Sequence, residues 1–135
     1  MVYNSSKPGK QRAETRRASF TKRRKLVSAR LSPALSEAYG RRSVPVRRGD
    51  TVQVQRGDYS EISGKVLRVD YKSGRVQVEG ATRERVDGRP AAVLIHASKV
   101  LVTKLDLEDE LRARSLGRVK AAAKAEEKTS TADAS

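Results

Sequence analysis

Residues 48–69, RGDTVQVQRGDYSEISGKVLRV, alternate valine with polar residues and contain Arg-Gly-Asp twice. Alternation with a period of two is typical of a strand that buries one face. Gly49 and Gly57 flank the run Thr51–Gln55. Glycine accepts the positive φ of a tight turn, and aspartate can hydrogen-bond its own backbone there. We therefore interpret both tripeptides as turns, and not as adhesion sequences, which would require an exported protein.

Short β-branched runs recur outward from this stretch, at residues 52–54, 65–69, 75–79, 92–95 and 100–103. Turn signals that contain glycine separate several of them. Val66 and Val69 are three positions apart, so we expect a β-bulge or bend near Leu67 and Arg68. Five short strands without intervening helices predict a mainly β fold, a small barrel of about five antiparallel strands.

The same alternation predicts which side chains form the core. Pro45 and Pro90 fit strand starts or sheet edges, where no backbone donor is needed for the ladder. The valines that we expect to point inward are Val52, Val54, Val66, Val76, Val78 and Val102.

A short helix is predicted before the strands. Ser32 is a suitable N-cap, Pro33 suits the first helical position, and Gly40 lies where a helix would end. Leu35 and Tyr39, four positions apart, would share its buried face.

A second helix is predicted after the strands, in LDLEDELRARSLG at residues 105–117. Asp106 can cap it, Leu107 and Leu111 would lie on one face, and Gly117 would end it. Residues 120–135 are low in complexity, and we expect them to be frayed or disordered. The chain thus divides into a basic arm with a short helix (1–43), the barrel (44–104) and a C-terminal helix with a tail (105–135).

Charge is concentrated in the first third of the chain. The whole chain of 135 residues carries a net charge of +14. Residues 1–48 hold 14 basic and 2 acidic side chains, a net charge of +12. Such an excess repels itself unless a polyanion neutralises it. Residues 1–31 show no sustained periodicity, so we expect an arm that is disordered alone and ordered on RNA.

Several function classes are excluded by composition. The chain has no Cys and one His, which removes disulfides, thiolate zinc sites and the usual metal clusters. No apolar run reaches the roughly 18 residues of a membrane span, and no secretory signal is visible. Neither a nucleophile elbow nor a phosphate-cradling glycine loop is present. We therefore expect a soluble, intracellular protein that is not an enzyme, with no cofactor, metal or small-molecule substrate.

The arm interleaves cations with Ser, Thr and one aromatic residue, a mixture that suits contacts with phosphates. Phe20 could stack on a base or anchor the arm to the barrel. Arg41 and Arg42 could interact with the end of the preceding helix dipole or reach a phosphate. The residues of this region that we expect to contact RNA are Arg12, Arg16, Arg17, Phe20, Lys22, Arg23, Arg24, Lys25, Arg30, Arg41, Arg42, Arg47 and Arg48.

The segment from Arg48 to Val69, with Gly57 and Gly64-Lys65-Val66, resembles a KOW motif, the RNA-binding hairpin of an SH3-like barrel. The flanks RLSPALSEAYGRRSVPVRRGDTVQVQRG (30–57) and IHASKVLVTKLDLEDELRARSLGR (95–118) make the resemblance more specific. Together they resemble the universal KOW-containing family of the large ribosomal subunit, in its eukaryotic and archaeal form. The resemblance covers residues 12–120.

The resemblance implies a structural protein that binds large-subunit ribosomal RNA near its 5′ end, early in assembly, and lies near the polypeptide exit tunnel. It implies neighbouring ribosomal proteins as partners, no homo-oligomer, and a cytoplasmic ribosome with nucleolar assembly if the source is eukaryotic. Carried over by position, the RNA-facing residues of the loop and turn are Arg56, Tyr59, Lys65, His96, Ser98 and Lys99. Arg68, on the motif's second strand, completes the expected set.

Two positions depart from the family pattern. The hairpin loop usually has a second glycine where this chain has Glu61, which puts a left-handed turn in question and adds a carboxylate that would weaken a phosphate contact. The common His-Pro-Ser-Lys is here His96-Ala97-Ser98-Lys99. Loss of the proline loosens that turn and keeps its polar groups.

Other interpretations remain open from the residues alone. Tyr59 and Tyr71 could cover barrel edges or stack on bases, and His96 could simply stabilise a turn. Solvated surface or phosphate contact is equally compatible with Lys72, Arg75, Arg83 and Arg85. The alternative function is a KOW-type transcription elongation factor that binds RNA and polymerase. Such a factor normally brings a further α/β domain, for which 135 residues leave no room.

Overall fold

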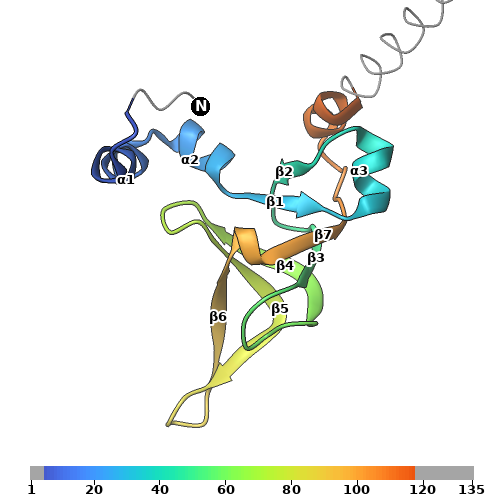
Figure 1. Cartoon of the computed structure of the whole chain (residues 1–135). Helices are drawn as coiled ribbons and strands as arrows, with labels where there is room; N and C mark the ends of the chain where they lie inside the picture. Colours follow the sequence, from blue (N-terminus) through green and yellow to red (C-terminus); the bar gives the residue numbers. More distant parts are fainter. Residues whose placement is uncertain (1–4, 118–135) are drawn as a thin grey trace, which may run out of the picture.

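The computed structural model describes residues 5–117, which form one seven-stranded sheet in the order β2-β1-β7-β3-β4-β5-β6 (Figure 1). The strands are β1 (Ser28–Leu31), β2 (Ser43–Pro45), β3 (Thr51–Val54), β4 (Ser63–Asp70), β5 (Arg75–Glu84), β6 (Pro90–His96) and β7 (Val100–Lys104). The helices are α1 (Pro8–Arg17), α2 (Phe20–Leu26), α3 (Pro33–Tyr39) and the single-turn η1 (Ala97–Lys99). Residues 110–117 are also helical.

The valine alternation buries one face of the strands, as predicted. All six valines expected in the core are buried, because every second side chain of a strand points to the same face. Residues outside the predicted strands complete this core: Val27, Ala29 and Leu31 from the N-terminal side and Leu116 from the C-terminal helix.

The mainly β fold is confirmed, with two corrections to its details. The sheet has seven strands, where five were expected, and it remains open, with β2 and β6 at its edges. It is also not wholly antiparallel, because β1 pairs with β7 in parallel through Arg30↔Leu101 and Leu31↔Val102. β1 lies in the segment that we assigned to the arm, so the sheet begins before residue 44.

The bend expected in β4 is present. The register of β4 and β5 shifts between Val66 and Arg68, which leaves Leu67 exposed and keeps Val66 in the core. Pro45 lies in the edge strand β2 and Pro90 begins the edge strand β6, as the missing donor of proline predicts.

Helix α3 has the predicted ends. The side chain of Ser32 accepts a hydrogen bond from the backbone N–H of Leu35 at 3.4 Å, and Pro33 follows it. Gly40 ends the helix in the left-handed conformation, with φ of +63°. Leu35 and Tyr39 pack against the core.

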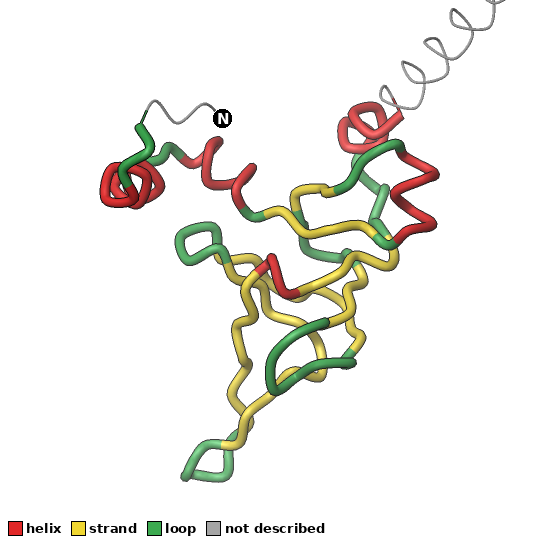
Figure 2. Tube along the Cα trace, viewed as in Figure 1, coloured by secondary structure: helices red, strands yellow, loops and turns green. Residues whose placement is uncertain are grey.

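The basic arm contains more regular structure than its sequence pattern predicted. α1 and α2 both lie in it, and neither has a side-chain cap. Both consist largely of Lys, Arg and other residues that favour helix, which accounts for helices without a buried apolar stripe. Figure 2 shows the two helices leading into β1 above the sheet.

The C-terminal helix is present but begins at residue 110, so Leu107, which was expected to share a face with Leu111, precedes it. Asp109 accepts a hydrogen bond from the backbone of Leu111 and so occupies the capping position expected of Asp106. Leu111 is 72% exposed and Leu107 is 40% exposed, whereas Arg112 and Leu116 are buried. Gly117 is helical, and whether the helix ends there, as predicted, lies outside the described residues. The predicted low-complexity tail lies outside the described residues.

Candidate nucleic-acid interface

The loop between β3 and β4 is a compact turn built on two left-handed residues. Gly57 has φ of +101° and Glu61 has φ of +73°. The left-handed turn that Glu61 put in question is therefore formed without glycine. Backbone hydrogen bonds from Ser60 to Gly57 and from Glu61 to Val54 close the loop, and it presents Arg56 and Tyr59 on its surface.

The corner between β6 and β7 places a histidine in a defined tautomer. The Nδ1 atom of His96 accepts a hydrogen bond from the backbone N–H of Ser98 at 3.2 Å and lies 2.8 Å from its Oγ. Because Nδ1 is the acceptor, the neutral imidazole carries its proton on Nε2. His96 is exposed, so this N–H is available to a phosphate or a base oxygen.

Pairing within the sheet brings these two corners together. The N–H of Gln55 donates to the carbonyl of Lys99 at 2.8 Å, which places the start of the β3–β4 loop beside η1. Arg75 pairs with His96 across β5 and β6.

A groove of about 310 Å³ lies between the two corners. Its polar rim is formed by Arg56, Tyr59, Arg75, His96 and Lys99. Four of these residues were predicted to face RNA; Arg75, whose role was open, joins them. Val93, Leu94 and Ile95 provide an apolar strip in the same groove. Cations and an aromatic ring around an apolar strip suit a nucleotide, whose base stacks while its phosphate takes the charge.

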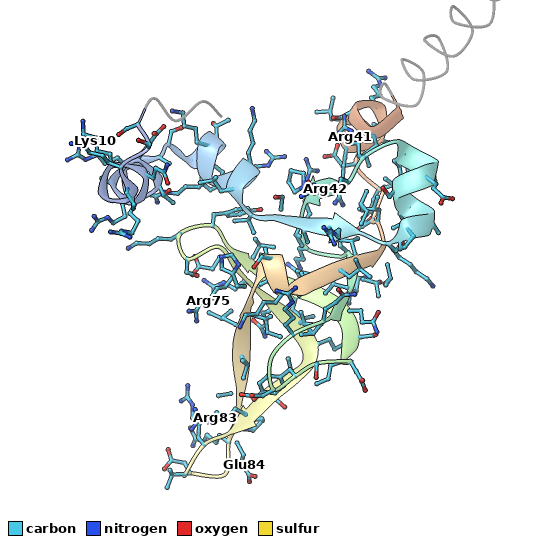
Figure 3. All side chains as sticks on the ribbon, in the orientation of Figure 1. Lys10, Arg41, Arg42, Arg75, Arg83 and Glu84 are labelled. Atoms are coloured by element: carbon cyan, nitrogen blue, oxygen red, sulfur yellow. The ribbon has the colours of Figure 1, made fainter. Side chains whose placement is uncertain are left out.

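Two other predicted loop and turn residues do not line this groove. Ser98 orients His96, and Lys65 is exposed on β4 beside Gly49 and Asp106. Arg83 and Arg85 lie at the far end of the β5–β6 hairpin, where Arg83 is labelled in Figure 3, away from the groove.

Most of the predicted cations of the arm and its flanks are on the surface. The exposed ones are Arg12, Arg16, Arg17, Lys22, Arg24, Lys25, Arg30, Arg42, Arg48 and Arg68. Arg23 is half-buried and donates to the carbonyl of Arg16 at 2.6 Å. Lys22 lies 3.9 Å from Glu14, an exposed pair that leaves its charge largely hydrated.

Two of the cations predicted to contact RNA also make contacts within the protein. Arg41 donates to the carbonyl of Ser115 at 2.8 Å, and Arg47 forms an ion pair with Asp109. Both contacts hold the C-terminal helix, and the hydrogen bond from Arg47 is the main reason that the pKa of Asp109 lies below its ordinary value.

Phe20 makes the contact that an anchor requires. Its ring meets Tyr71 edge-to-face, with the centroids 5.3 Å apart. Tyr71 sits in the turn between β4 and β5, which Figure 1 shows beneath the start of β1. Asp70 stabilises that turn by accepting from the Ser73 hydroxyl and the Lys72 N–H, and these bonds lower its pKa. Phe20 is still 65% exposed, so part of its ring remains accessible.

Sequence reasoning missed residues whose partners are distant in the chain. Arg75 joins the groove only because the β5–β6 register places it opposite His96. Asp50 of the first Arg-Gly-Asp was assigned to a turn, and it does accept from Arg47 N–H, yet it also holds the buried Arg112. The strand pairing, had it been known, would have predicted the place of Arg75 in the groove. No local sequence signal indicates the contact between Asp50 and Arg112.

Residues 5–117 contain no group of three or more His, Cys, Asp or Glu side chains placed to hold a metal ion. Over the same part of the chain, no helix has the length and apolar character needed to cross a membrane.

Comparison with known proteins identifies the family. A model of the eukaryotic ribosomal proteins L26 and their archaeal counterparts matches residues 5–119. A relative from Saccharolobus solfataricus is 47% identical over 116 residues, which is 86% of this chain and 98% of the relative. Another from Natronomonas pharaonis is 49% identical over 105 residues, 78% of this chain and 88% of the relative. Both relatives are named large ribosomal subunit protein uL24. The chain belongs to this family of ribosomal proteins.

Proposed function

We propose that this chain is a structural constituent of the large ribosomal subunit and binds its ribosomal RNA. The matched family is ribosomal, and relatives that align over almost their whole length carry the name of a large-subunit protein. A structural role is typical of such a family, and catalysis is not part of the proposal.

The observation that carries the RNA contact is the groove between the β3–β4 loop and the β6–η1 corner. Arg56, Lys99 and Arg75 supply three cations, and His96 adds an N–H donor. Tyr59 is half-buried, packs against the core and lines the groove. Groups fixed on a folded surface can recognise RNA shape, whereas a flexible cation mostly follows phosphate density.

The arm contributes charge at a second place. Its two short helices display their cations on all sides, since neither helix buries a residue of its own. Figure 3 shows this spread of side chains around Lys10. The arm would lie between RNA helices, where phosphates approach from more than one direction. Its docking through Phe20 and Tyr71 would set the direction in which it leaves the sheet.

The finer assignments follow from the family resemblance. They are binding near the 5′ end of the large-subunit RNA, early action in assembly, and a final position near the polypeptide exit tunnel, beside neighbouring ribosomal proteins. Its cellular location would then be the cytoplasmic ribosome, with nucleolar assembly if the source is eukaryotic. The transcription-factor alternative finds no support, because the relatives that span this chain are named as ribosomal.

Sedimentation tests the function directly. The tagged chain is expressed in cells, and a lysate is resolved on a sucrose gradient at moderate and high salt. We expect the chain to travel with the large subunit and to remain there at high salt. An Arg56→Ala, Lys99→Ala double variant should be released at lower salt, whereas Arg114→Ala, an exposed cation away from the groove, should not. A wild-type chain that stays at the top of the gradient would exclude the proposal.

A further inference from the structure

A second cleft, of about 500 Å³, lies between α2, β2 and the C-terminal helix. It shares none of its lining residues with the groove described above. Val44, Pro45 and Leu116 form an apolar floor, and Leu111 projects from the C-terminal helix at its side. Its volume falls within the roughly 300–1,000 Å³ of typical ligand pockets.

Leu111 is an exposed leucine that lines this cleft. It is 72% exposed, although Leu116 on the same helix is buried in the core. Leu111 is therefore not needed to dock the helix, yet it presents an apolar side chain inside a concave surface. Such a side chain gains free energy only when something else covers it.

The rim of the cleft is cationic. Arg24 and Lys25 are exposed on α2, and Arg41 faces them from the other side with one hydrogen bond to Ser115. A guanidinium has five N–H donors, so Arg41 retains donors for a ligand. The acidic residue in the lining, Asp109, is neutralised by Arg47. The cleft is thus complementary to a ligand that carries negative charge beside an apolar surface.

We infer that this cleft binds one extruded nucleotide of single-stranded RNA, with the base against Leu111 and the apolar floor and the flanking phosphates on Arg24, Lys25 and Arg41. Unstacked bases of RNA loops and bulges offer flat apolar faces, and each base is joined through its ribose to a phosphate. The inference rests on the proposed RNA-binding function and adds a second base-contacting site to it. The protein then holds two RNA segments, one at each end of the sheet.

A binding experiment separates the contribution of the base from that of the phosphates. The full chain is titrated against fluorescein-labelled decaadenylate and against a ribose-phosphate strand of the same length without bases, with anisotropy as the readout. The wild type should bind decaadenylate several-fold more tightly. Leu111→Ser should reduce that preference by roughly threefold or more, since it removes the apolar wall and leaves the charge. Leu107→Ser, an exposed leucine of the same segment outside the cleft, is the matched control and should keep the preference.

The rim is tested with the same two strands. An Arg24→Gln, Lys25→Gln variant should weaken both to the same extent. Each lost phosphate contact should reduce the slope of log affinity against log salt by roughly 0.7, the value for single strands. Circular dichroism of each variant confirms that the fold is retained.

The outcomes distinguish the two claims. If the wild type binds neither strand, the proposed RNA-binding function is wrong. If it binds both strands but Leu111→Ser keeps the full preference for decaadenylate, the cleft is not a nucleotide site and the proposed function stands. If a peptide of alternating Glu and Leu binds in a Leu111-dependent way while RNA binding ignores Leu111, the cleft is a protein site and the inference is overturned.

Discussion

The guanidinium of Arg112 holds the carboxylate of Asp50 through two hydrogen bonds, of 2.6 and 2.7 Å, with the two side chains 6% and 0% exposed. Arg112 also donates to the backbone carbonyls of Asp106 and Pro45. Asp50 in turn accepts from the N–H groups of Arg47 and Asp106. This buried network ties the C-terminal helix to the first Arg-Gly-Asp turn.

Removing one partner of this pair should destabilise the protein strongly. Arg112→Met leaves a buried carboxylate without its counter-charge, and we expect a loss of about 3–5 kcal/mol in the free energy of unfolding. Arg112→Lys keeps the charge but loses the two parallel hydrogen bonds of the guanidinium. Its free energy of unfolding should therefore lie between those of the wild type and Arg112→Met. Urea unfolding measures both. Arg114→Met, on the exposed side of the same helix, should change stability by no more than about 0.5 kcal/mol.

Truncation should show that the fold extends beyond the predicted barrel. A fragment of residues 44–107 lacks β1, Leu116 and Arg112, so we expect it to be unfolded by circular dichroism. A fragment of residues 27–117 retains them and should fold cooperatively. A folded 44–107 fragment would mean that the predicted strands are sufficient and that β1 is an accessory.

Glu61 offers a stabilising substitution. A non-glycine residue in the left-handed region costs roughly 1–2 kcal/mol, part of which Glu61→Gly recovers. Glycine also increases the entropy of the unfolded chain, which offsets part of this gain, so we expect the free energy of unfolding to rise by up to about 1 kcal/mol. Gly57→Ala should lower the stability, because it places a side chain at φ of +101°. No heavy atom lies within 4 Å of the added Cβ, so backbone strain alone causes the effect. Thermal unfolding of the two variants would contradict this reasoning if their shifts had the same sign.

The arm should carry most of the salt dependence of RNA binding. Replacing Arg16, Arg17, Arg23, Arg24 and Lys25 with Ala preserves helix propensity and removes five charges. Each lost phosphate contact should reduce the slope of log affinity against log salt by roughly 0.7–0.9. We expect weaker binding to all RNAs and a slope shallower by several units. RNA titrations at several salt concentrations measure the slope. A variant that kept the wild-type slope would contradict the claim that the arm makes most of the phosphate contacts.

Replacing Arg56, Tyr59 and Lys99 with Ala provides the comparison for the groove. This variant should change the salt slope less. It should instead reduce discrimination between a large-subunit ribosomal RNA fragment and unrelated RNA of equal length, because the lost groups are held on the folded surface.

The turn below the arm should respond to acid. Hydrogen bonds from the Ser73 hydroxyl and the Lys72 N–H hold the pKa of Asp70 below its ordinary value of 3.8. The lowered pKa means that the stabilisation is fully present above about pH 4 and is lost as pH falls through the folded pKa. Ser73→Ala removes the largest cause, so the pKa should rise towards the ordinary value. An NMR titration of the Asp70 carboxyl carbon measures this, with Ser98→Ala as a control that should leave it unchanged.

Local signals predicted local structure well. Helix α3 followed from Ser32, Pro33 and Gly40, whose roles depend only on neighbours in the chain. The bulge in β4 followed from the spacing of Val66 and Val69, because residues three apart on a regular strand point to opposite faces, and both of these side chains pack on the core.

Features that depend on distant partners were missed or misplaced. The C-terminal helix was predicted, but the burial of Arg112 in it was not, because its partner Asp50 lies far away in the sequence. The groove was only partly predicted: the family resemblance supplied four of its rim residues, while Arg75 needed the strand register. β1 was assigned to the arm because its four residues, Ser-Ala-Arg-Leu, carry too few β-branched side chains to signal a strand.

The parallel pairing of β1 with β7 has a consequence for the newly made chain. Leu31 finds its partner at Val102, after every intervening strand has been synthesised. A translating ribosome therefore releases the cationic segment first and the strand that receives β1 last. Such non-local closure slows folding, because chain entropy is lost before the contact is gained. Until β1 pairs with β7, the arm is a free polycation that RNA or a chaperone can bind.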